Sequence, residues 1–193
     1  IIVGTQLISK GHNFPYLKSV GILNIDSLLN DFDFRSFEKS FQQIVQVSGR
    51  AGRKDFIGNV FIQTIQPKHP VLKFCKENKF EDFYNWELKK RETNKQPPFY
   101  NYISLIISGK KQPYVKNFSK SLFESIRRSF RGCKTFGPAP AVISLKNKKY
   151  RYRILIKIEK NIAYQNNIKK FLKNIKVPQS LRLYIDVDPI SFL

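Results

Sequence analysis

The sequence predicts a mixed α/β protein in two parts, and three observations support this fold class. First, 41% of the 193 residues are hydrophobic and 14% are aromatic, enough to build a folded core despite a formal charge of +21. Second, two near-continuous apolar runs flank an amphipathic segment in the first 70 residues, as in parallel sheets covered by helices. Third, the region from residue 99 onward has the order strand, helix, strand, strand, helix, strand.

Residues 1–68 are expected to form a piece of an α/β layer. Strands are predicted at residues 1–3, 20–25 and 59–64, and a helix at residues 35–47. The helix has apolar residues at positions i, i+4, i+7 and i+8, the spacing of one buried stripe. These residues are Phe37, Phe41, Ile44 and Val45.

Residues 69–98 are interpreted as a connector. A mixed helical stretch at residues 71–93 is followed by Pro97-Pro98, where a helix cannot continue.

Residues 99–193 are expected to form a second domain with a ferredoxin-like βαββαβ order, in which two helices cover one face of a sheet. Strands are predicted at residues 102–107, 141–145, 152–158 and 181–187. Helices are predicted after the first and third of these strands, and a basic turn at residues 146–149 joins the second strand to the third.

The positive charge is concentrated in the second part. Residues 1–70 carry 8 basic and 5 acidic side chains, whereas residues 71–193 carry 27 and 9. Such a surface attracts polyanions, and nucleic acid is the most common one in a cell. No apolar stretch approaches the roughly 18 residues of a membrane-spanning helix, so a membrane is not expected as a partner. A gene of high A+T content is an alternative source of part of the lysine excess.

Alternation in the last two predicted strands places basic side chains on the face without helices. The residues are Arg151, Arg153, Lys157 and Arg182. Basic and aromatic side chains on an open sheet suit single-stranded nucleic acid, through phosphate pairing and base stacking. The alternatives are that these residues only keep the face soluble, or that other domains cover it.

Two glycine-flanked segments in the first part are more specific. Residues 4–15 read GTQLISKGHNFP and follow an apolar run, and residues 46–53 read QVSGRAGR and end the predicted helix. Two arginines three residues apart between glycines can both point at one anion, as arginine fingers do. Local roles are the alternative, with glycines forming turns and the arginines capping a helix end.

Together the two segments resemble motifs V and VI of the second RecA-like lobe of superfamily 2 helicases. Further markers are GPAPA at residues 137–141, YRYR at residues 150–153 and DVDP at residues 186–189. With these the chain is similar to the primosomal protein N′ family of bacterial replication-restart helicases. The resemblance covers nearly the whole chain. It implies that residues 1–68 are the end of a RecA-like lobe.

The resemblance also assigns site residues. It implies that Gln46, Arg50 and Arg53 face the nucleotide with Gly49 beside them, the arginines at the γ-phosphate. It implies that the other segment contacts DNA through Gly4, Thr5, Gln6 and Lys10. His12 and His69 are interpreted as loop residues without a catalytic role.

Several parts of an ATPase are missing from the sequence. There is no G-x-x-x-x-G-K-[ST] phosphate loop and no recognisable acidic motif for Mg²⁺. Cys75 and Cys133 lack nearby ligand partners, so no zinc site or disulfide framework is expected. In the family these elements, including a cysteine-rich zinc insertion, precede the matching region. The chain, which contains no Met, is therefore expected to be a fragment that shares ATP and Mg²⁺ with an absent N-terminal part.

The resulting hypothesis is the C-terminal part of an ATP-dependent DNA helicase that restarts stalled replication in the bacterial cytoplasm, at the nucleoid. The resemblance implies forked and single-stranded DNA, single-stranded DNA-binding protein and other primosome proteins as partners. A purely nucleic-acid-binding or ribosome-associated module is the alternative, and a motor lobe kept only as a scaffold is another.

Overall fold

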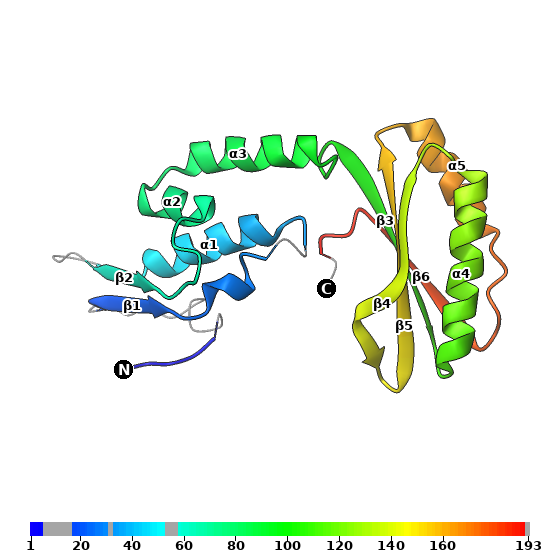
Figure 1. Ribbon diagram of the computed structural model, residues 1–193, viewed down its shortest axis with the longest axis horizontal. Helices are drawn as coiled ribbons and strands as arrows, with labels where there is room; N and C mark the ends of the chain where they lie inside the picture. Colours follow the sequence, from blue (N-terminus) through cyan, green and yellow to red (C-terminus); the bar gives the residue numbers. More distant parts are fainter. Residues whose placement is uncertain (6–16, 31–32, 53–57, 192–193) are drawn as a thin grey trace. The chain divides into compact units, whose positions relative to one another are not determined.

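The computed structural model describes residues 1–5, 17–30, 33–52 and 58–191. The chain divides into two compact units, Ile1–Lys90 and Arg91–Leu193. Each unit has its own cluster of buried apolar side chains. The architecture is mixed α and β, as the composition and patterning predict (Figure 1).

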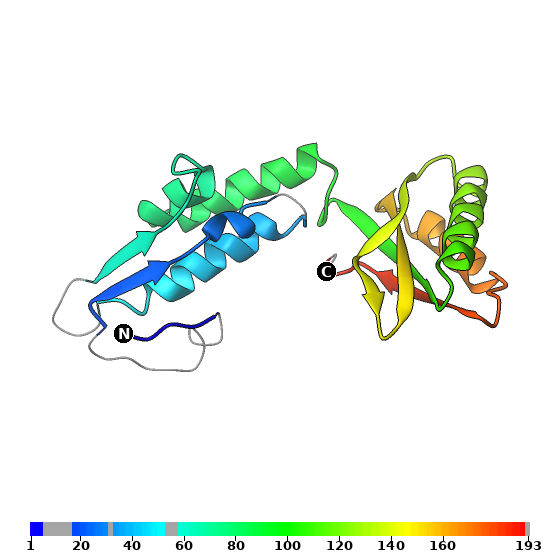
Figure 2. The same ribbon diagram turned by 60° about the horizontal axis from the view of Figure 1, so that its bottom comes forward.

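A small parallel sheet organises the first unit. Strand β1 (Ser19–Ile22) pairs with β2 (Asn59–Ile62), and the short 3-10 helix η1 (Ile25–Ser27) follows β1. Helix α1 (Ser36–Ser48) lies beside the two strands (Figure 2). The helix buries Phe37, Phe41 and Ile44, three of the four residues of its predicted stripe, whereas Val45 is exposed.

Helices α2 (Pro70–Lys76) and α3 (Phe80–Thr93) complete the core of the first unit. Val71 and Leu72 of α2 and Phe83 of α3 belong to the same buried cluster as α1, and the Phe83 ring stacks on Phe41 at 4.1 Å. The expected connector at residues 69–98 is therefore largely part of the first unit. The division between units lies near the end of α3 instead, because the apolar residues of this stretch pack on α1.

The predicted strand at residues 1–3 is wrong. Residues 1–5 have no regular secondary structure and are exposed. An apolar run forms a strand only where a neighbouring strand accepts its hydrogen bonds. In the described part of the first unit, pairing is seen only between β1 and β2. The predicted strand at 20–25 also ends early, at Ile22, since Asn24 turns the chain with a φ of 53°.

The second unit has the element order that the sequence predicts. Its elements are β3 (Tyr100–Gly109), α4 (Gln112–Ser129), β4 (Lys134–Lys146), β5 (Lys149–Glu159), α5 (Ile162–Lys173) and β6 (Leu181–Val187). The strands form one sheet in the order β4-β5-β3-β6, and each neighbouring pair is antiparallel.

Both helices of the second unit cover the same face of this sheet (Figure 1). Alternate residues of β3 and β5 point towards the helices, where they meet Val115, Leu122 and Ile126 of α4 and Ile168 and Leu172 of α5. The sheet residues of this core are Ile103, Leu105, Ile107, Tyr152, Ile154, Ile156 and Ile158. The opposite face has no helix of this unit on it.

Strand β4 is much longer than the predicted strand at 141–145. It begins at Lys134 and passes through two register shifts, between Phe136 and Ala139 and between Pro140 and Leu145. Gly137 allows the first shift, because its φ is 101° and a Cβ there would lie 2.6 Å from the Arg153 carbonyl oxygen. The predicted basic turn follows, with Asn147 and Lys148 both at positive φ as in tight hairpins.

Candidate nucleic-acid interface

The strand register brings the predicted basic residues together on the helix-free face of the sheet. Arg151 and Arg182 both pair with Ser108 of the central strand β3, and Arg153 pairs with Ile106, which also pairs with Tyr184. Residues that are directly opposite one another share a face. We call this surface the open face, defined by Tyr102, Ser104, Ile106, Ser108, Lys134, Phe136, Arg151, Arg153, Leu155, Lys157, Arg182, Tyr184 and Asp186.

A pocket of about 420 Å³ lies in the open face. Arg151 and Arg153 line it from β5, Tyr184 and Asp186 from β6, and the bulged segment 141–143 of β4 closes one side. The Arg151 guanidinium donates a hydrogen bond of 3.3 Å from Nη1 to the Ile143 carbonyl oxygen. That bond holds the guanidinium at the wall and leaves its other N–H groups available to a ligand. Asp186 is the one acidic residue among the described residues that line this pocket.

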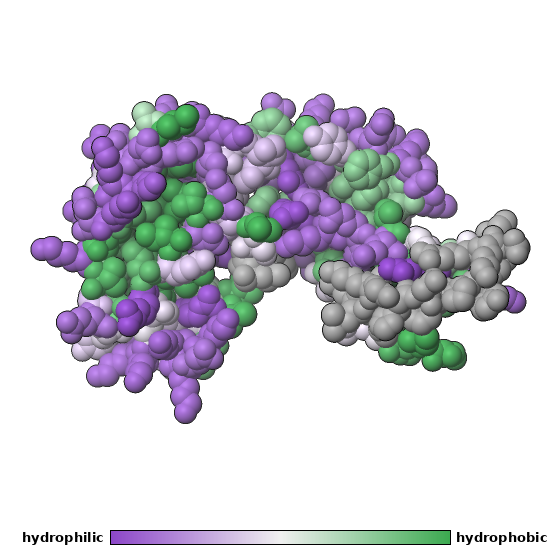
Figure 3. Space-filling model, turned by 180° about the vertical axis from the view of Figure 1, so that it is seen from behind, coloured by the Kyte–Doolittle hydropathy of each residue, from purple (hydrophilic) through white to green (hydrophobic). Residues whose placement is uncertain are grey.

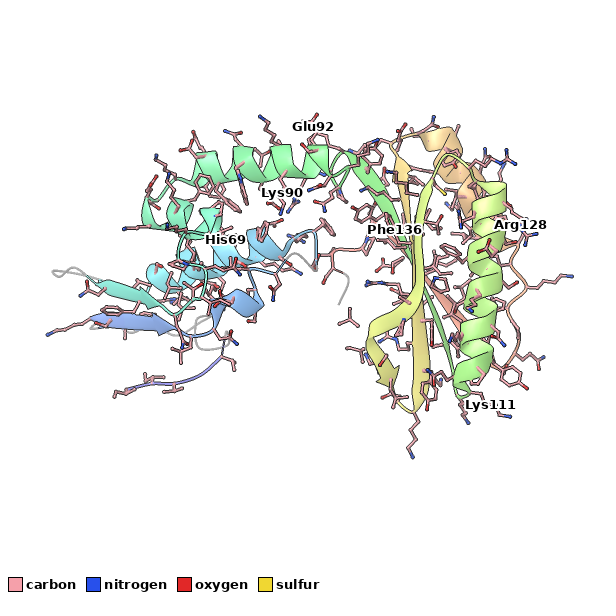
Figure 4. The ribbon with its side chains drawn as sticks, in the orientation of Figure 1. His69, Lys90, Glu92, Lys111, Arg128 and Phe136 are labelled. Atoms are coloured by element: carbon pink, nitrogen blue, oxygen red, sulfur yellow. The ribbon has the colours of Figure 1, made fainter. Side chains whose placement is uncertain are left out.

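Aromatic rings stand beside these cations. The Tyr184 side chain is 62% exposed and Phe136 is 49% exposed; Figure 4 labels Phe136 on β4. Both are residues that would normally be buried or paired, and an exposed ring next to an arginine is a surface on which a nucleic-acid base can stack.

Lys157 lies at the other end of the open face, among further cations. Its Nζ lies 5.9 Å from the Tyr100 ring centre and 5.8 Å from that of Tyr102, and it donates to the Asn94 carbonyl oxygen. Burial lowers the pKa of the Lys157 ammonium, and the charges of Lys134 and Lys95 lower it further. This end of the face therefore accumulates positive charge that an anion would relieve.

The predicted nucleotide residues lie at the end of α1. Gln46 is exposed in the last turn, Gly49 ends the helix, and the Arg50 amide donates to the Val47 carbonyl at 3.0 Å. The next residues are tied to the segment that precedes β1, since the Gly52 amide donates to the Leu17 carbonyl at 3.1 Å. Gln46, Gly49 and Arg50 thus come together on one short segment, with Arg50 half-buried.

The other residues of the two motif segments are only partly described. Arg53, Gln6 and Lys10 lie outside the described residues, as does His12. Gly4 and Thr5 are exposed in the N-terminal stretch without regular structure.

The donor groups at the end of α1 can bind the phosphates of a nucleotide but not its Mg²⁺ ion. A guanidinium and a side-chain amide can bind phosphate oxygens, whereas Mg²⁺ requires oxygen ligands, chiefly carboxylates and water. Across the described ranges, no group of three or more His, Cys, Asp or Glu side chains is placed to hold a metal ion. In the same ranges, no helix is both long and apolar enough to cross a membrane.

His69 has a structural role in the described first unit. Its Nδ1 accepts a 3.3 Å hydrogen bond from the Val71 amide at the start of α2, and its ring lies 5.0 Å from that of Phe37. Figure 4 shows His69 and Lys90, and Lys90 Nζ lies 3.7 Å from the centre of the same Phe37 ring. Burial and the Lys90 charge lower the pKa of His69.

Sequence reasoning missed part of the open face. Lys134 and Phe136 lie outside the predicted strand at residues 141–145, and their alternation with Thr135 is the signal that places both on one face. Tyr184 lies two residues after Arg182 in β6, so the same period of two places its ring on this face.

Comparison with known protein families shows to which family the chain belongs. The family described as "Primosomal protein N C-terminal domain" matches residues 92–190. The chain belongs to this family. It is 36% identical over 192 residues to the replication restart protein PriA of Rickettsia typhi, and the match covers 100% of this chain and 29% of that protein.

Other PriA proteins align over the same extent. PriA of Synechocystis is 36% identical over 196 residues, covering 99% of this chain and 23% of that protein. PriA of Bacillus subtilis is 34% identical over 198 residues, covering 100% and 24%. The chain thus spans less than a third of the length of these PriA relatives, and it corresponds to a C-terminal fragment of PriA.

Proposed function

We propose that the chain is the C-terminal part of an ATP-dependent DNA helicase that restarts stalled replication, and that its second unit binds single-stranded DNA and forks through the open face. The restart role is supported by relatives that are named replication restart proteins. The single observation that carries DNA binding is the shared face of Arg151, Arg153, Lys157 and Arg182, with the exposed rings of Tyr184 and Phe136 among them.

Each kind of side chain on this face has a distinct part in the proposed binding. The arginines and lysine pair with phosphates and release counterions, which gives affinity without sequence preference. The rings of Tyr184 and Phe136 stack on unpaired bases, so the face favours single strands over duplex. Asp186 repels phosphates and keeps the backbone towards β5, where the Arg151 and Arg153 side chains line the pocket.

The fold assignment for each unit is part of the proposal. The strand order β4-β5-β3-β6 with antiparallel neighbours supports a ferredoxin-like second unit. The parallel pair β1 and β2 beside α1 supports the end of a RecA-like lobe.

The first unit then contributes to the motor of the complete protein. Arg50 and Arg53 stabilise charge on the γ-phosphate, Gln46 and Gly49 lie beside them, and ATP supplies the phosphoryl group whose hydrolysis drives unwinding. The segment containing Gly4, Thr5, Gln6 and Lys10 contacts the DNA backbone. Mg²⁺ and zinc would be held by residues of the complete protein outside this chain.

Replication proteins are the proposed partners of the complete protein in the bacterial cytoplasm, at the nucleoid. They are single-stranded DNA-binding protein and the other primosome proteins. Forked DNA brings the helicase and these proteins to the same place.

A test replaces Arg151 and Arg153 together by Ala in the 193-residue chain and measures binding to a fluorescent single strand over a range of salt concentrations. We expect weaker binding and a salt slope shallower by about 0.7 per lost phosphate contact. The matched control replaces Lys116 and Lys120, two exposed lysines of α4, which face away from the open face. If the control loses affinity and the arginine variant does not, DNA binds on the helices and the proposal fails.

A further inference from the structure

A second pocket, of about 580 Å³, lies at the edge of the sheet where β3 ends and β5 and β6 begin. We call it the basic pocket and define it by Lys110, Lys111, Tyr114, Lys149, Ser180 and Arg182. Lys110 and Lys111 lie in the turn between β3 and α4. Lys149 is the first residue of β5 and Arg182 lies in β6, so the fold gathers the four cations from three places in the chain. Figure 4 labels Lys111 at this end of α4.

The lining of the basic pocket carries positive charge. Its polar side chains are ammonium, guanidinium, hydroxyl and amide groups, and none of the described lining residues is acidic. Within the described residues, neither Lys110, Lys111, Lys149 nor Arg182 forms an ion pair. Four like charges around a concave surface repel one another, and a bound anion is what offsets that cost.

Aromatic surface accompanies the charge. The Tyr114 side chain is 61% exposed in the first turns of α4, and Lys111 Nζ lies 5.6 Å from its ring centre. A pocket of this volume holds more than an isolated ion and is within the range of small-ligand sites. A phosphate with an attached sugar or base matches it: the oxygens meet the cations and the organic part meets the ring.

The basic pocket adjoins the open face. Arg182 lines the basic pocket and belongs to the open face, and Ser108 lines both pockets. Figure 3 shows hydrophilic side chains over much of the surface of the second unit, around a smaller hydrophobic area. A strand that lies across β5 and β6 would therefore reach the basic pocket past Arg151 and Arg182, which both lie opposite Ser108.

We propose that the basic pocket is a separate phosphate-binding site, and that it holds a phosphate group of a nucleic-acid strand, either at the strand's 5′ end or within its backbone. The nucleic-acid source rests on the proposed function, whereas the phosphate chemistry does not. A terminal phosphate carries a charge of about −1.5 to −2 at neutral pH, and an internal one carries a single charge. The two sources therefore differ in how strongly four cations attract them.

The test uses the 193-residue chain with Lys110 and Lys111 replaced by Ala, and separately with Lys149→Ala. The control is again the pair Lys116 and Lys120, which removes the same charge from α4 outside the pocket. Inorganic pyrophosphate binding is measured by calorimetry, and binding of a short single strand with a 5′-phosphate or a 5′-hydroxyl is measured by fluorescence anisotropy. All replaced lysines are exposed, and circular dichroism checks that the fold is retained.

We expect pyrophosphate affinity to fall about tenfold in both pocket variants and to remain unchanged in the control. If the strand end is the ligand, the wild-type chain prefers the 5′-phosphate and the pocket variants lose that preference. If the backbone is the ligand, both strands bind less tightly and with a shallower salt slope.

Two results would overturn the proposal: pyrophosphate affinity that is the same in wild type, pocket variants and control, or competition at the pocket by an acidic peptide but not by pyrophosphate. The outcomes also separate this site from the open face. Pyrophosphate binding can depend on the pocket lysines while the Arg151 and Arg153 variant still binds DNA as tightly as the wild type. That combination supports the basic pocket and contradicts DNA binding by the open face.

Discussion

Lys134 and Lys157 lie directly opposite each other on the antiparallel strands β4 and β5. Like charges in this arrangement destabilise a sheet, and Lys134 is one of the two cations that lower the pKa of Lys157. Lys95, the other cation, lies in the turn after α3. The pair therefore leaves charge repulsion on the open face that a bound anion would offset.

The first prediction concerns this pair. Lys134→Gln should raise the free energy of unfolding of the second unit by about 0.5 kcal/mol at low salt, because it removes the cross-strand repulsion. The gain should disappear at about 1 M salt, where charges are screened within about 3 Å. The same variant should bind single-stranded DNA more weakly. Thermal unfolding and fluorescence anisotropy measure the two effects.

Lys120→Gln is the matched control, since it removes one exposed lysine without a charge opposite it on a neighbouring strand. An equal stabilisation in both variants would mean that only the net charge of +21 matters. That result would remove the argument for a local anion site at Lys134 and Lys157.

The second prediction compares two acidic residues, Asp186 in β6 and Asp188 just after the strand. Asp188 joins the end of β6 to β3: its carboxylate accepts two 2.9 Å bonds from Asn101 Nδ2 and one of 3.2 Å from the Tyr102 amide. Asp186 lies in the open face beside Ser104. Asp188→Ala should lower the free energy of unfolding by about 0.5–1.5 kcal/mol, because Asn101 and the Tyr102 amide lose their acceptor.

Asp186→Asn should leave stability nearly unchanged and strengthen binding of single-stranded DNA about two- to fivefold, because it removes a repulsive charge from the pocket. Chemical denaturation and a DNA titration measure both variants. Tighter DNA binding by Asp188→Ala together with no effect of Asp186→Asn would show that the strand does not lie across β6.

The sequence predicts the second unit better than the first because of where the hydrogen-bond partners lie. In the second unit every strand pairs with another strand of the same 95-residue region, so alternation such as that of Arg153 and Ile154 is sufficient to assign faces. Residues 1–3 have the same apolar character but no described partner strand, and apolar character alone predicted a strand there wrongly. The bulges of β4 were missed because Gly137 and the prolines around it interrupt the alternation.

The open face could be predicted from the sequence, whereas the basic pocket could not. Shared faces follow from a period of two, so the placement of Arg151 and Arg182 on one face could be predicted. The basic pocket could not, since Lys110, Lys149 and Arg182 come from segments whose proximity depends on strand order. The packing of α3 on α1 could not be predicted either: Phe83 stacks on Phe41 from more than 40 residues away, and no local pattern indicates that contact.

The third prediction is a pH dependence of the first unit. The pKa of His69 is lowered in the folded state by burial and by Lys90, so the unfolded state binds more protons below the usual pKa of 6.5. The stabilisation from neutral His69 is therefore present above pH 6.5 and is lost as the pH falls through 6.5 towards the folded-state value. Protonation also removes the Nδ1 acceptor that caps α2.

Urea unfolding at pH 7.5 and 5.5, followed by the fluorescence of the single tryptophan, Trp86, measures this effect within the core that contains Phe37. His69→Asn keeps a capping oxygen but does not titrate. The variant should lose less stability than the wild type between the two pH values. An identical loss in both would assign the pH dependence to other groups.

The last prediction tests the proposed motor role of the residues after α1. In a complete protein that contains this chain, Arg50→Ala or Arg53→Ala should lower DNA-stimulated ATP hydrolysis by about 10³-fold or more, because charge on the γ-phosphate is no longer stabilised. DNA binding should be nearly unchanged, since neither arginine belongs to the open face. Arg35→Ala is the control: Arg35 lies just before α1, at the end of that helix opposite to Arg50, and pairs with Glu38 at 2.6 Å. If ATP turnover is normal in the Arg50 and Arg53 variants, or falls equally in Arg35→Ala, these arginines do not act on the nucleotide.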